Sequence, residues 1–285
     1  MLQYYVKEHK NSIFENNTLP QLLYIASTKD MEQYFPRMLH KHADHLEIVF
    51  VAEGRGNHII GDTKYDTKEG DILIFNRGVI HDEMAQVNSN MLVYCCGIAN
   101  LHIKGMETNC LFDVTAPAVI QSGEYAENIN MIMQMMFSHI KRNTPNAIEL
   151  CHYLLSSLVT IIVSLPRTPR KRLLYKKETL VDQVKSYLEG HYAEAITLAK
   201  LARRFNVSES YLSHLFKNKT KFSPIQYLNR LRIGEAQSLL MTTNYSIADI
   251  ALAVGYDNIN YFSMAFSKAT GISPTLYRTL WIGNK

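Results

Sequence analysis

Apolar residues follow two different periods along the chain, and the change divides it into a strand-rich first part and a helical second part. Up to about residue 115, short runs of β-branched and aromatic residues alternate with turns that contain glycine. The runs include 46–51, 57–60 and 71–75, and the turns include Gly54, Gly56, Gly61, Gly70 and Gly78. Several short strands at this spacing predict a small antiparallel barrel or sandwich.

Two helical patterns follow the strands. From Tyr125 to Arg142 and from Asn146 to Ser164, apolar residues recur every three to four positions, and Pro145 separates the two patterns. The second pattern is apolar on more than one stripe, so this helix must be buried on more than one side. It packs either on its own barrel alone or also against a partner subunit, and we assign the pair to dimerisation. Its most apolar stretch, Tyr153 to Leu165, has about 13 residues and is too short to span a bilayer.

A basic segment with two prolines, residues 165–178, comes next. It holds six basic residues, and its like charges and prolines predict a linker. The net charge of +4 is unevenly divided, because residues 1–164 hold 12 Lys/Arg against 18 Asp/Glu and residues 165–285 hold 18 against 8. A basic part joined to an acidic part indicates one domain that binds a polyanion, or else a solvated basic face with no partner.

The second part repeats itself after 50 residues. Seven of the 17 positions from 211 to 227 carry the same residue type 50 positions later: Tyr211, Ser213, Phe216, Thr220, Ser223, Pro224 and Tyr227. Each copy is typical of a helix, a tight turn and a second helix. The N-cap candidates are Thr197, Ser208 and Ser246, and Gly255 suits a helix end that needs a positive φ. Between the copies, residues 225–241 predict a long helix that holds the two units at a fixed separation.

The second helix of each copy presents a polar row. The residues expected to face inward are Leu212, Leu215 and Phe216 in copy one and Tyr261, Phe262, Ala265 and Phe266 in copy two. The outward residues are Glu209, Ser210, Ser213, His214 and Lys217 in copy one and Asn258, Asn260, Ser263, Met264 and Ser267 in copy two. A short exposed row of Ser, Asn and His on a helix of a basic domain suits base-edge contacts in the major groove.

Several motifs of this part resemble the AraC/XylS family of regulators. They are Leu228-x-x-Leu-Arg-Ile233, Ala236-x-x-Leu-Leu240, Ile247-Ala-x-Ile-Ala251, Val254-Gly-Tyr256, Tyr261-Phe-Ser263, Phe266 and Gly271-Ile-Ser-Pro274-x-x-Tyr-Arg278. The resemblance implies a seven-helix domain whose two reading helices enter successive segments of the major groove. It also implies base-facing positions at Ser210, Ser213, His214, Asn260, Ser263 and Met264.

Three residues depart from the family pattern. Met264 stands where the family very often has arginine, Ser267 where it often has lysine, and Lys221 replaces the usual helix-ending glycine of copy one. Copy two is therefore expected to contribute shape fit more than hydrogen-bonded readout. We assign Lys217 and Arg230 to phosphate contacts.

A second constellation lies in the strand-rich part. His40, His42, Glu47 and His81 are potential metal ligands on predicted strands, and strand alternation places His40 and His42 on one face. Together with Gly54, Gly70 and Gly78 they resemble the two cupin motifs, although Asn76 replaces the usual proline. This resemblance implies a β-barrel with a pocket, which Arg37, His58, Tyr65 and Tyr94 could also reach.

Two uses of the four side chains stay open. The sensor domains of AraC-like regulators often keep such residues while they bind organic effectors, by resemblance sugars or small acids. We therefore assign His40, His42, Glu47 and His81 to ligand contacts. A Mn, Fe, Ni or Zn site is the alternative, and no other cofactor is expected.

These patterns predict an α+β multidomain chain. The expected segments are a cupin-like ligand-sensing β-barrel (1–120), a helical pair for dimerisation (121–164), a basic linker (165–178) and an AraC-type DNA-binding domain (179–285), with helix-turn-helix units at about 197–220 and 246–270. The expected function is control of transcription, in the direction of activation, by a homodimer that binds double-stranded DNA, a small effector and RNA polymerase. The rival is a metal-dependent cupin enzyme with a DNA-binding appendage.

Location follows from what the chain lacks at its start. Residues 1–10 show no signal-peptide pattern, and the four cysteines have no zinc-type spacing. We expect reduced thiols, a cytoplasmic protein without a membrane partner, and no enzymatic activity.

Overall fold

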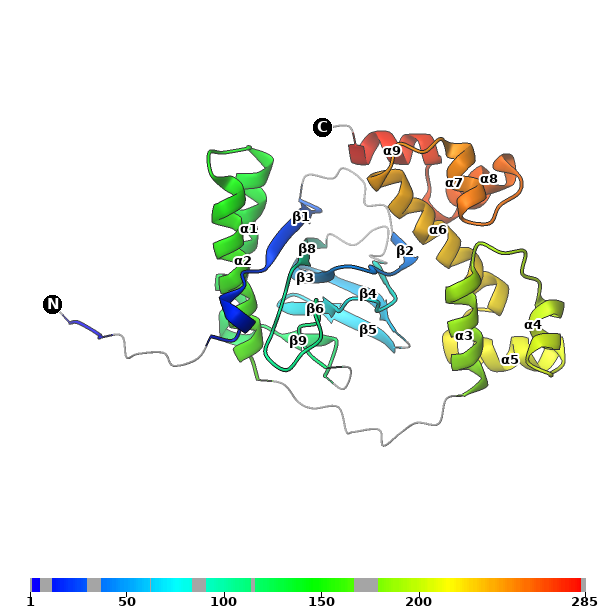
Figure 1. The fold of residues 1–285 in the computed structure, drawn as a ribbon, viewed down its shortest axis with the longest axis horizontal. Coiled ribbons are helices and arrows are strands. Elements are labelled where there is room, and N and C mark those ends of the chain that lie inside the picture. Colours follow the sequence, from blue (N-terminus) through cyan, green and yellow to red (C-terminus); the bar gives the residue numbers. More distant parts are fainter. Residues whose placement is uncertain are drawn as a thin grey trace.

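The computed structural model describes residues 2–5, 12–29, 37–61, 63–83, 91–113, 116–166 and 179–282, and Figure 1 shows a strand-rich unit with helices on two sides. The strands are β1 (Gln21–Ser27), β2 (Arg37–His40), β3 (Leu46–Glu53), β4 (Arg55–Ile60), β5 (Thr63–Lys68), β6 (Asp71–Phe75), β7 (His81–Glu83), β8 (Leu92–Ala99) and β9 (Val119–Gln121). They form a five-stranded sheet, in the order β1-β8-β3-β6-β9, and a four-stranded sheet, in the order β2-β7-β4-β5. The paired strands are antiparallel.

Strand β3 is buried on both faces, which explains why its sequence is apolar almost without alternation. Leu46, Ile48 and Phe50 belong to the core that the five-stranded sheet shares with two helices. Val49 belongs to a second core that contains residues of both sheets. Glu47 shares the parity of Val49, so its carboxylate lies inside the barrel.

Helices α1 (Ala126–Lys141) and α2 (Ala147–Ser164) cover one face of the five-stranded sheet. Among the described helices, α2 is long and apolar enough by length and composition to cross a membrane, with 18 residues and a mean hydropathy of 1.7. The helix is longer than the apolar stretch counted from Tyr153, as the helix predicted from Asn146 to Ser164 already was. The indication is weak, since Cys151, Leu155 and Leu158 of α2 are fully buried in the barrel core.

Seven helices make up the described part of the chain after residue 178. They are α3 (Leu180–His191), α4 (Leu198–Arg204), α5 (Glu209–Thr220), α6 (Pro224–Thr242), α7 (Ile247–Ala253), α8 (Ile259–Thr270) and α9 (Pro274–Ile282). The side chains of Thr197, Ser208 and Ser246 each accept a backbone N–H in the first turn of their helices, so the three predicted N-caps are confirmed. Gly255 has the predicted positive φ, at +87°.

The two units also contact each other. Strand β2 lies against the long helix α6, and Figure 1 shows α6 between the barrel and the two helix-turn-helix units. Met38 of β2 joins the apolar cluster around α6, α7 and α8, and Leu39 joins the cluster around α3, α4 and α5. The cores of the C-terminal helices therefore extend onto the barrel.

The predicted α+β class is confirmed, with the barrel first and the two helix-turn-helix units after it. The predicted domain boundaries stay predictions. Most of the predicted basic linker, residues 167–178, lies outside the described residues.

Candidate DNA interface and sensor site

The first reading helix, α5, buries one face and exposes the predicted polar row. Leu212 and Phe216 are fully buried, whereas Glu209, Ser210, His214 and Lys217 are exposed and Ser213 is partly exposed. The Ser208 cap fixes the start of the helix, and Asn218 Nδ2 lies 3.3 Å from His214 Nδ1 one turn further on. The row is thus presented on a helix whose first turn and packing face are both fixed.

The second reading helix, α8, corrects the prediction at one position. Phe262 and Phe266 are fully buried as expected, but Tyr261 is 59% exposed. Its counterpart Tyr211 in α5 is 54% exposed. Each tyrosine precedes the buried residue of its helix by one position, about 100° around the axis, so it is carried off the packing face. The repeat indicated a shared role for this position, because both copies have tyrosine there.

The other predicted residues of α8 differ in how they are used. Asn260 and Met264 are exposed, with Met264 at 71%, and Ser263 and Ser267 are partly exposed. Asn258 is the N-cap, and its side-chain oxygen accepts the N–H groups of Asn260 and Tyr261 at 2.9 and 3.0 Å. Its oxygen is therefore occupied by the helix, while its amide group remains a donor for a partner.

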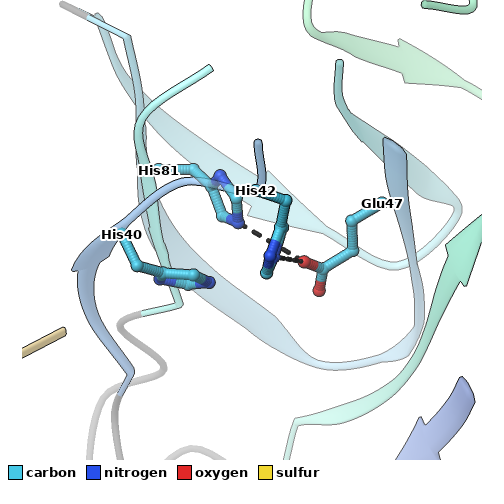
Figure 2. Close-up of side chains that lie close together, drawn as sticks. All are labelled: His40, His42, Glu47 and His81. Atoms are coloured by element: carbon cyan, nitrogen blue, oxygen red, sulfur yellow. Dashed lines mark hydrogen bonds and ion pairs between the residues drawn. The ribbon is translucent and has the colours of Figure 1, made fainter. Parts of the chain in front are cut away.

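In the barrel, the four predicted sensor residues come together. Their ligand-type atoms all lie within 4.8 Å of one another, although they come from β2, β3, β7 and the segment after β2 (Figure 2). His40 and His81 are paired across β2 and β7. His42 lies just beyond the end of β2 rather than on the predicted strand, and its ring is 5.0 Å from that of His40. The residues are His40, His42, Glu47 and His81.

Hydrogen bonds orient two of these imidazoles. Nδ1 of His40 lies 2.8 Å from the carbonyl oxygen of Met38, and Nδ1 of His81 lies 2.9 Å from that of Val79. A carbonyl oxygen only accepts, so Nδ1 of each ring carries a proton. Nε2 of His81 lies 3.4 Å from Oε2 of Glu47. A proton or a cation between these two atoms would hold them together.

Burial controls the protonation of the cluster. Desolvation lowers the pKa of His40 well below its usual value and also lowers that of His42. For Glu47, desolvation alone would raise the pKa, but hydrogen bonds with His42 and His81 hold it well below its usual value. The site therefore combines neutral imidazole donors with a buried carboxylate, the chemical type of set that binds divalent transition metals.

Two side chains beside the cluster were not predicted. The thiol of Cys95 donates to Oε1 of Glu47, while His42 contacts Oε2 at 2.7 Å. The ring of His45 stacks on that of His42 at 4.0 Å, and Asp44 accepts from His45 at 2.7 Å. The apolar run around Cys95 gave no sign of a polar role, whereas the three histidines in the six residues from 40 to 45 were a signal that could have included His45.

The four side chains expected to reach the pocket are dispersed. Arg37 points to Ser238 of α6, with 3.4 Å between Nη2 and Oγ. Tyr94 is buried in the core under the helices, with its ring 6.1 Å from that of Phe137. His58 is buried on β4, where desolvation lowers its pKa to about 4.

Tyr65, the fourth, lines a cleft of about 540 Å³ at one edge of the barrel. Its apolar wall includes Ile60, Val79 and Phe112, and Arg77 is among its polar residues. Asn76 holds one side of the cleft, because its side chain donates to the Phe112 carbonyl at 2.7 Å and accepts the Leu111 N–H at 2.9 Å. The cleft has the size of a small-molecule site.

Comparisons with known proteins agree with both halves of this arrangement. Family models match residues 201–279 as a helix-turn-helix domain and residues 32–95 as a cupin domain. The chain is 29% identical over 244 residues to the uncharacterized HTH-type transcriptional regulator YdiP of Escherichia coli K12, which covers 84% of this chain and 80% of YdiP. It is 26% identical over 246 residues to the HTH-type transcriptional activator RhaR of the same strain, with coverages of 85% and 86%. The chain therefore carries an AraC-type helix-turn-helix domain and a cupin domain, and its relatives are HTH-type transcriptional regulators.

One solved structure is also similar. It is the C-terminal domain of AraT, a response regulator from Geobacillus stearothermophilus, at 37% identity and a TM-score of 0.36, covering 37% of this chain and 88% of that chain. The two domain matches and the curated relatives make this protein a transcription regulator with a cupin domain and an AraC-type DNA-binding domain, and that domain supports double-stranded DNA as its partner. The matched relatives are regulators, in line with a protein that is not an enzyme.

Within the AraC/XylS pattern, two departures have structural consequences. Lys221, which replaces the family glycine, is left-handed with φ at +69°, whereas the glycine kept in copy two, Gly271, has φ at +86°. Arg230 does not have the predicted role. It lies 3.1 Å from the fully buried carboxylate of Asp82 in the barrel, so it is a domain-contact residue rather than a phosphate ligand. The sequence could not reveal this partner 148 positions away.

Proposed function

We propose that this protein is an effector-responsive activator of transcription that binds its operator as a homodimer and contacts RNA polymerase. The observation that carries the proposal is the union, in one chain, of two exposed reading helices with a barrel that gathers four ligand-type side chains. The match to RhaR, an activator by its name, supports activation. Its place of action is the cytoplasm, where the DNA is.

The base-reading residues are those exposed on the two helices. Ser210, Ser213 and His214 of α5 read one major-groove segment, and Asn260, Ser263 and Met264 of α8 read the next. Glu209, Lys217 and Asn258 complete the interface, with Lys217 on phosphate. Met264 offers only apolar contact, so α8 contributes less hydrogen-bonded readout than α5.

Dimerisation uses the outer faces of α1 and α2. Large apolar residues are exposed there, among them Met131, Ile148 and Tyr153. Contiguous exposed apolar side chains on a soluble domain are typical of association surfaces. A twofold dimer would present two double helix-turn-helix domains to DNA.

The effector is a small polar molecule, a sugar or a small acid, that contacts His40, His42, Glu47 and His81. The cleft beside β5 and β6 supports this class, because Val79 both lines the cleft and anchors the ring of His81. A molecule in the cleft would therefore contact Val79, whose carbonyl oxygen binds the ring of His81 in the cluster.

A metal ion in the cluster is the second candidate, and one observation favours it. Nε2 of His81 and Oε2 of Glu47 face each other at 3.4 Å, and backbone carbonyls bind the Nδ1–H groups of His40 and His81 as outer-shell partners do in metal sites. His40, His42, Glu47 and His81 would hold the ion. A bound divalent metal would supply a Lewis-acidic position for an effector oxygen.

The experiment compares a duplex from the chain's own promoter region with a scrambled duplex, by fluorescence anisotropy at low and moderate ionic strength. A preference for the promoter duplex that changes when sugars or small acids are added supports the proposal. Equal affinities for both duplexes at every salt concentration would overturn it. Metal analysis of protein purified without a histidine tag decides the second candidate, and less than about a tenth of an equivalent per chain rejects it.

A further inference from the structure

The two strands that carry the sensor histidines also carry the contact with the DNA-binding domain. In β2 and β7, His40 and His81 lie opposite each other and face the cluster. Their neighbours Leu39 and Asp82 face α6, as alternation along a strand predicts, and Met38 also packs there, where the register of β2 is irregular between Arg37 and His40. One pair of short strands thus has the candidate ligand site on one side and a helix of the other domain on the opposite side (Figures 1 and 2).

The contact is built from specific polar groups. The backbone N–H of Met38 donates to the side-chain oxygen of Gln237 at 2.8 Å, and Asp82 pairs with Arg230 at 3.1 Å. Asp82 and Gln237 are fully buried. Gly234 lies between Arg230 and Gln237 on the same face of α6, where a Cβ atom would overlap the carbonyl oxygen of Leu39. The backbone of β2 approaches α6 this closely only because residue 234 has no side chain.

A short route joins the site to this contact. The carbonyl of Met38 accepts from Nδ1 of His40, and the N–H of the same residue donates to Gln237. On the second strand, Asp82 follows His81 directly and binds Arg230 with one oxygen and the N–H of Ile59 with the other. A displacement of either histidine ring therefore acts on a group that α6 also binds.

Helix α6 is the element through which a shift would reach both reading helices. It contacts α3, α5, α7, α8 and α9. The sensor contributes four apolar side chains to the contact: Met38, Leu39, Ile59 and Ile80. The contact thus combines buried apolar side chains with buried polar groups, and contacts between domains commonly separate and re-form.

We propose that the β2–β7 pair and α6 form an interdomain latch through which occupancy of the sensor cluster sets the position of the DNA-binding domain. The latch is Met38, Leu39 and Asp82 on the sensor side and Arg230, Gly234 and Gln237 on α6. The inference rests on the proposed function in taking the cluster to be the signal site. Occupancy and docking are then linked, so a change at one alters the free energy of the other.

A double-mutant cycle tests the latch without a known effector. Glu47→Gln alters the cluster, and Gly234→Ala pushes β2 off α6. Gly190→Ala is the matched control, since a Cβ at that position of α3 meets nothing. Affinity for the promoter duplex is measured by anisotropy at one salt concentration for Glu47→Gln in the wild-type, Gly190→Ala and Gly234→Ala backgrounds.

The latch predicts that Glu47→Gln changes DNA affinity by at least about fivefold in the wild-type and Gly190→Ala backgrounds. In the Gly234→Ala background the change should fall below about twofold. If Glu47→Gln changes DNA affinity equally in all three backgrounds, or in none of them, the latch is overturned. The proposed function is still supported in that case if the wild-type protein prefers the promoter duplex. Gln237→Leu replaces Gly234→Ala if circular dichroism shows that the glycine variant does not fold.

Small-angle scattering tests whether the sensor domain stays in contact with α6. This test holds even if no promoter duplex is preferred and the proposed function fails. The latch predicts a larger radius of gyration for Gly234→Ala or Gln237→Leu than for wild type and Gly190→Ala. The same radius for all the folded proteins would overturn the latch.

Discussion

Met38 donates its backbone N–H to the side-chain oxygen of Gln237 across 2.8 Å, and the two residues lie 199 positions apart in different domains. The carbonyl of Met38 is occupied as well, by Nδ1 of the sensor residue His40. One residue of a four-residue strand therefore satisfies groups of both domains. Removing either partner leaves a buried polar group without a hydrogen bond, which is why the position of α6 and that of the sensor cluster depend on each other.

His214 is predicted to read a base. His214→Ala should weaken binding to the promoter duplex by about 1–3 kcal/mol and leave binding to a scrambled duplex almost unchanged, because a base contact contributes only on the right sequence. Anisotropy titrations with both duplexes at one salt concentration measure the two losses. Equal losses on both duplexes would show that His214 contacts the backbone instead.

Lys217 and Arg230 are predicted to behave differently although both are cations on helices of the same domain. Lys217→Ala should reduce the slope of log affinity against log salt by about 0.9, because one phosphate contact is lost. Arg230→Gln should leave the slope unchanged but lower the free energy of unfolding by about 3 kcal/mol, because Asp82 stays buried without its cation. A flattened salt dependence in Arg230→Gln would contradict the domain-contact role.

Lys221 is predicted to strain the end of α5. Its φ of +69° is unfavourable for a residue with a Cβ atom, so Lys221→Gly should raise the free energy of unfolding by about 1 kcal/mol. Gly271→Lys at the matching position of α8 should lower it by a similar amount. Urea unfolding measures both variants, and a glycine variant no more stable than wild type would show that the conformation at 221 is not strained.

The local parts of this molecule could be predicted from the sequence because their signals are local. Caps such as Ser208, the inward positions Leu212 and Phe216, and the close spacing of His40 and His42 depend on neighbours within a few residues. Helix period and strand alternation report which face of an element is buried. They do not report what covers it.

The rest depended on distant partners. Gly234 lies inside the helix predicted at 225–241, and the carbonyl of Leu39 that packs against it belongs to the other domain. Arg230 was predicted to contact phosphate, but its partner Asp82 also belongs to the other domain. A glycine in a helix interior, which costs about 1 kcal/mol relative to alanine, was the signal available for the contact. Tyr261 was misplaced because aromatic residues were assumed to be inside.

Cys95 is predicted to position the carboxylate of Glu47. In Cys95→Ala, Oε1 of Glu47 loses the thiol donor in a fully buried site, and the free energy of unfolding should fall by about 1–3 kcal/mol. Cys95→Ser keeps a donor at the same place and should lose less. Chemical unfolding of the two variants is the measurement, and equal losses would mean that packing rather than the hydrogen bond matters at this position.

Asp182 is predicted to make the DNA-binding domain sensitive to acid. Burial alone would raise its pKa, but the hydrogen bonds from Lys219 and Thr179 outweigh it and lower the pKa to about 2. Because the folded pKa lies below the unfolded value near 3.8, the carboxylate stabilises the fold fully above pH 4 and progressively less as the pH falls toward 2.

Asp182→Asn should therefore reduce the free energy of unfolding by about 1–2 kcal/mol at pH 7, and the difference from wild type should shrink between pH 4 and pH 2. Thermal unfolding of both proteins across this range measures it, with Asp249→Asn, at the capping box of α7, as the control for a carboxylate that caps a helix without a lysine partner. Because Lys219 belongs to α5 and Asp182 to α3, a pH-independent difference would mean that this ion pair does not hold the first reading helix to its domain.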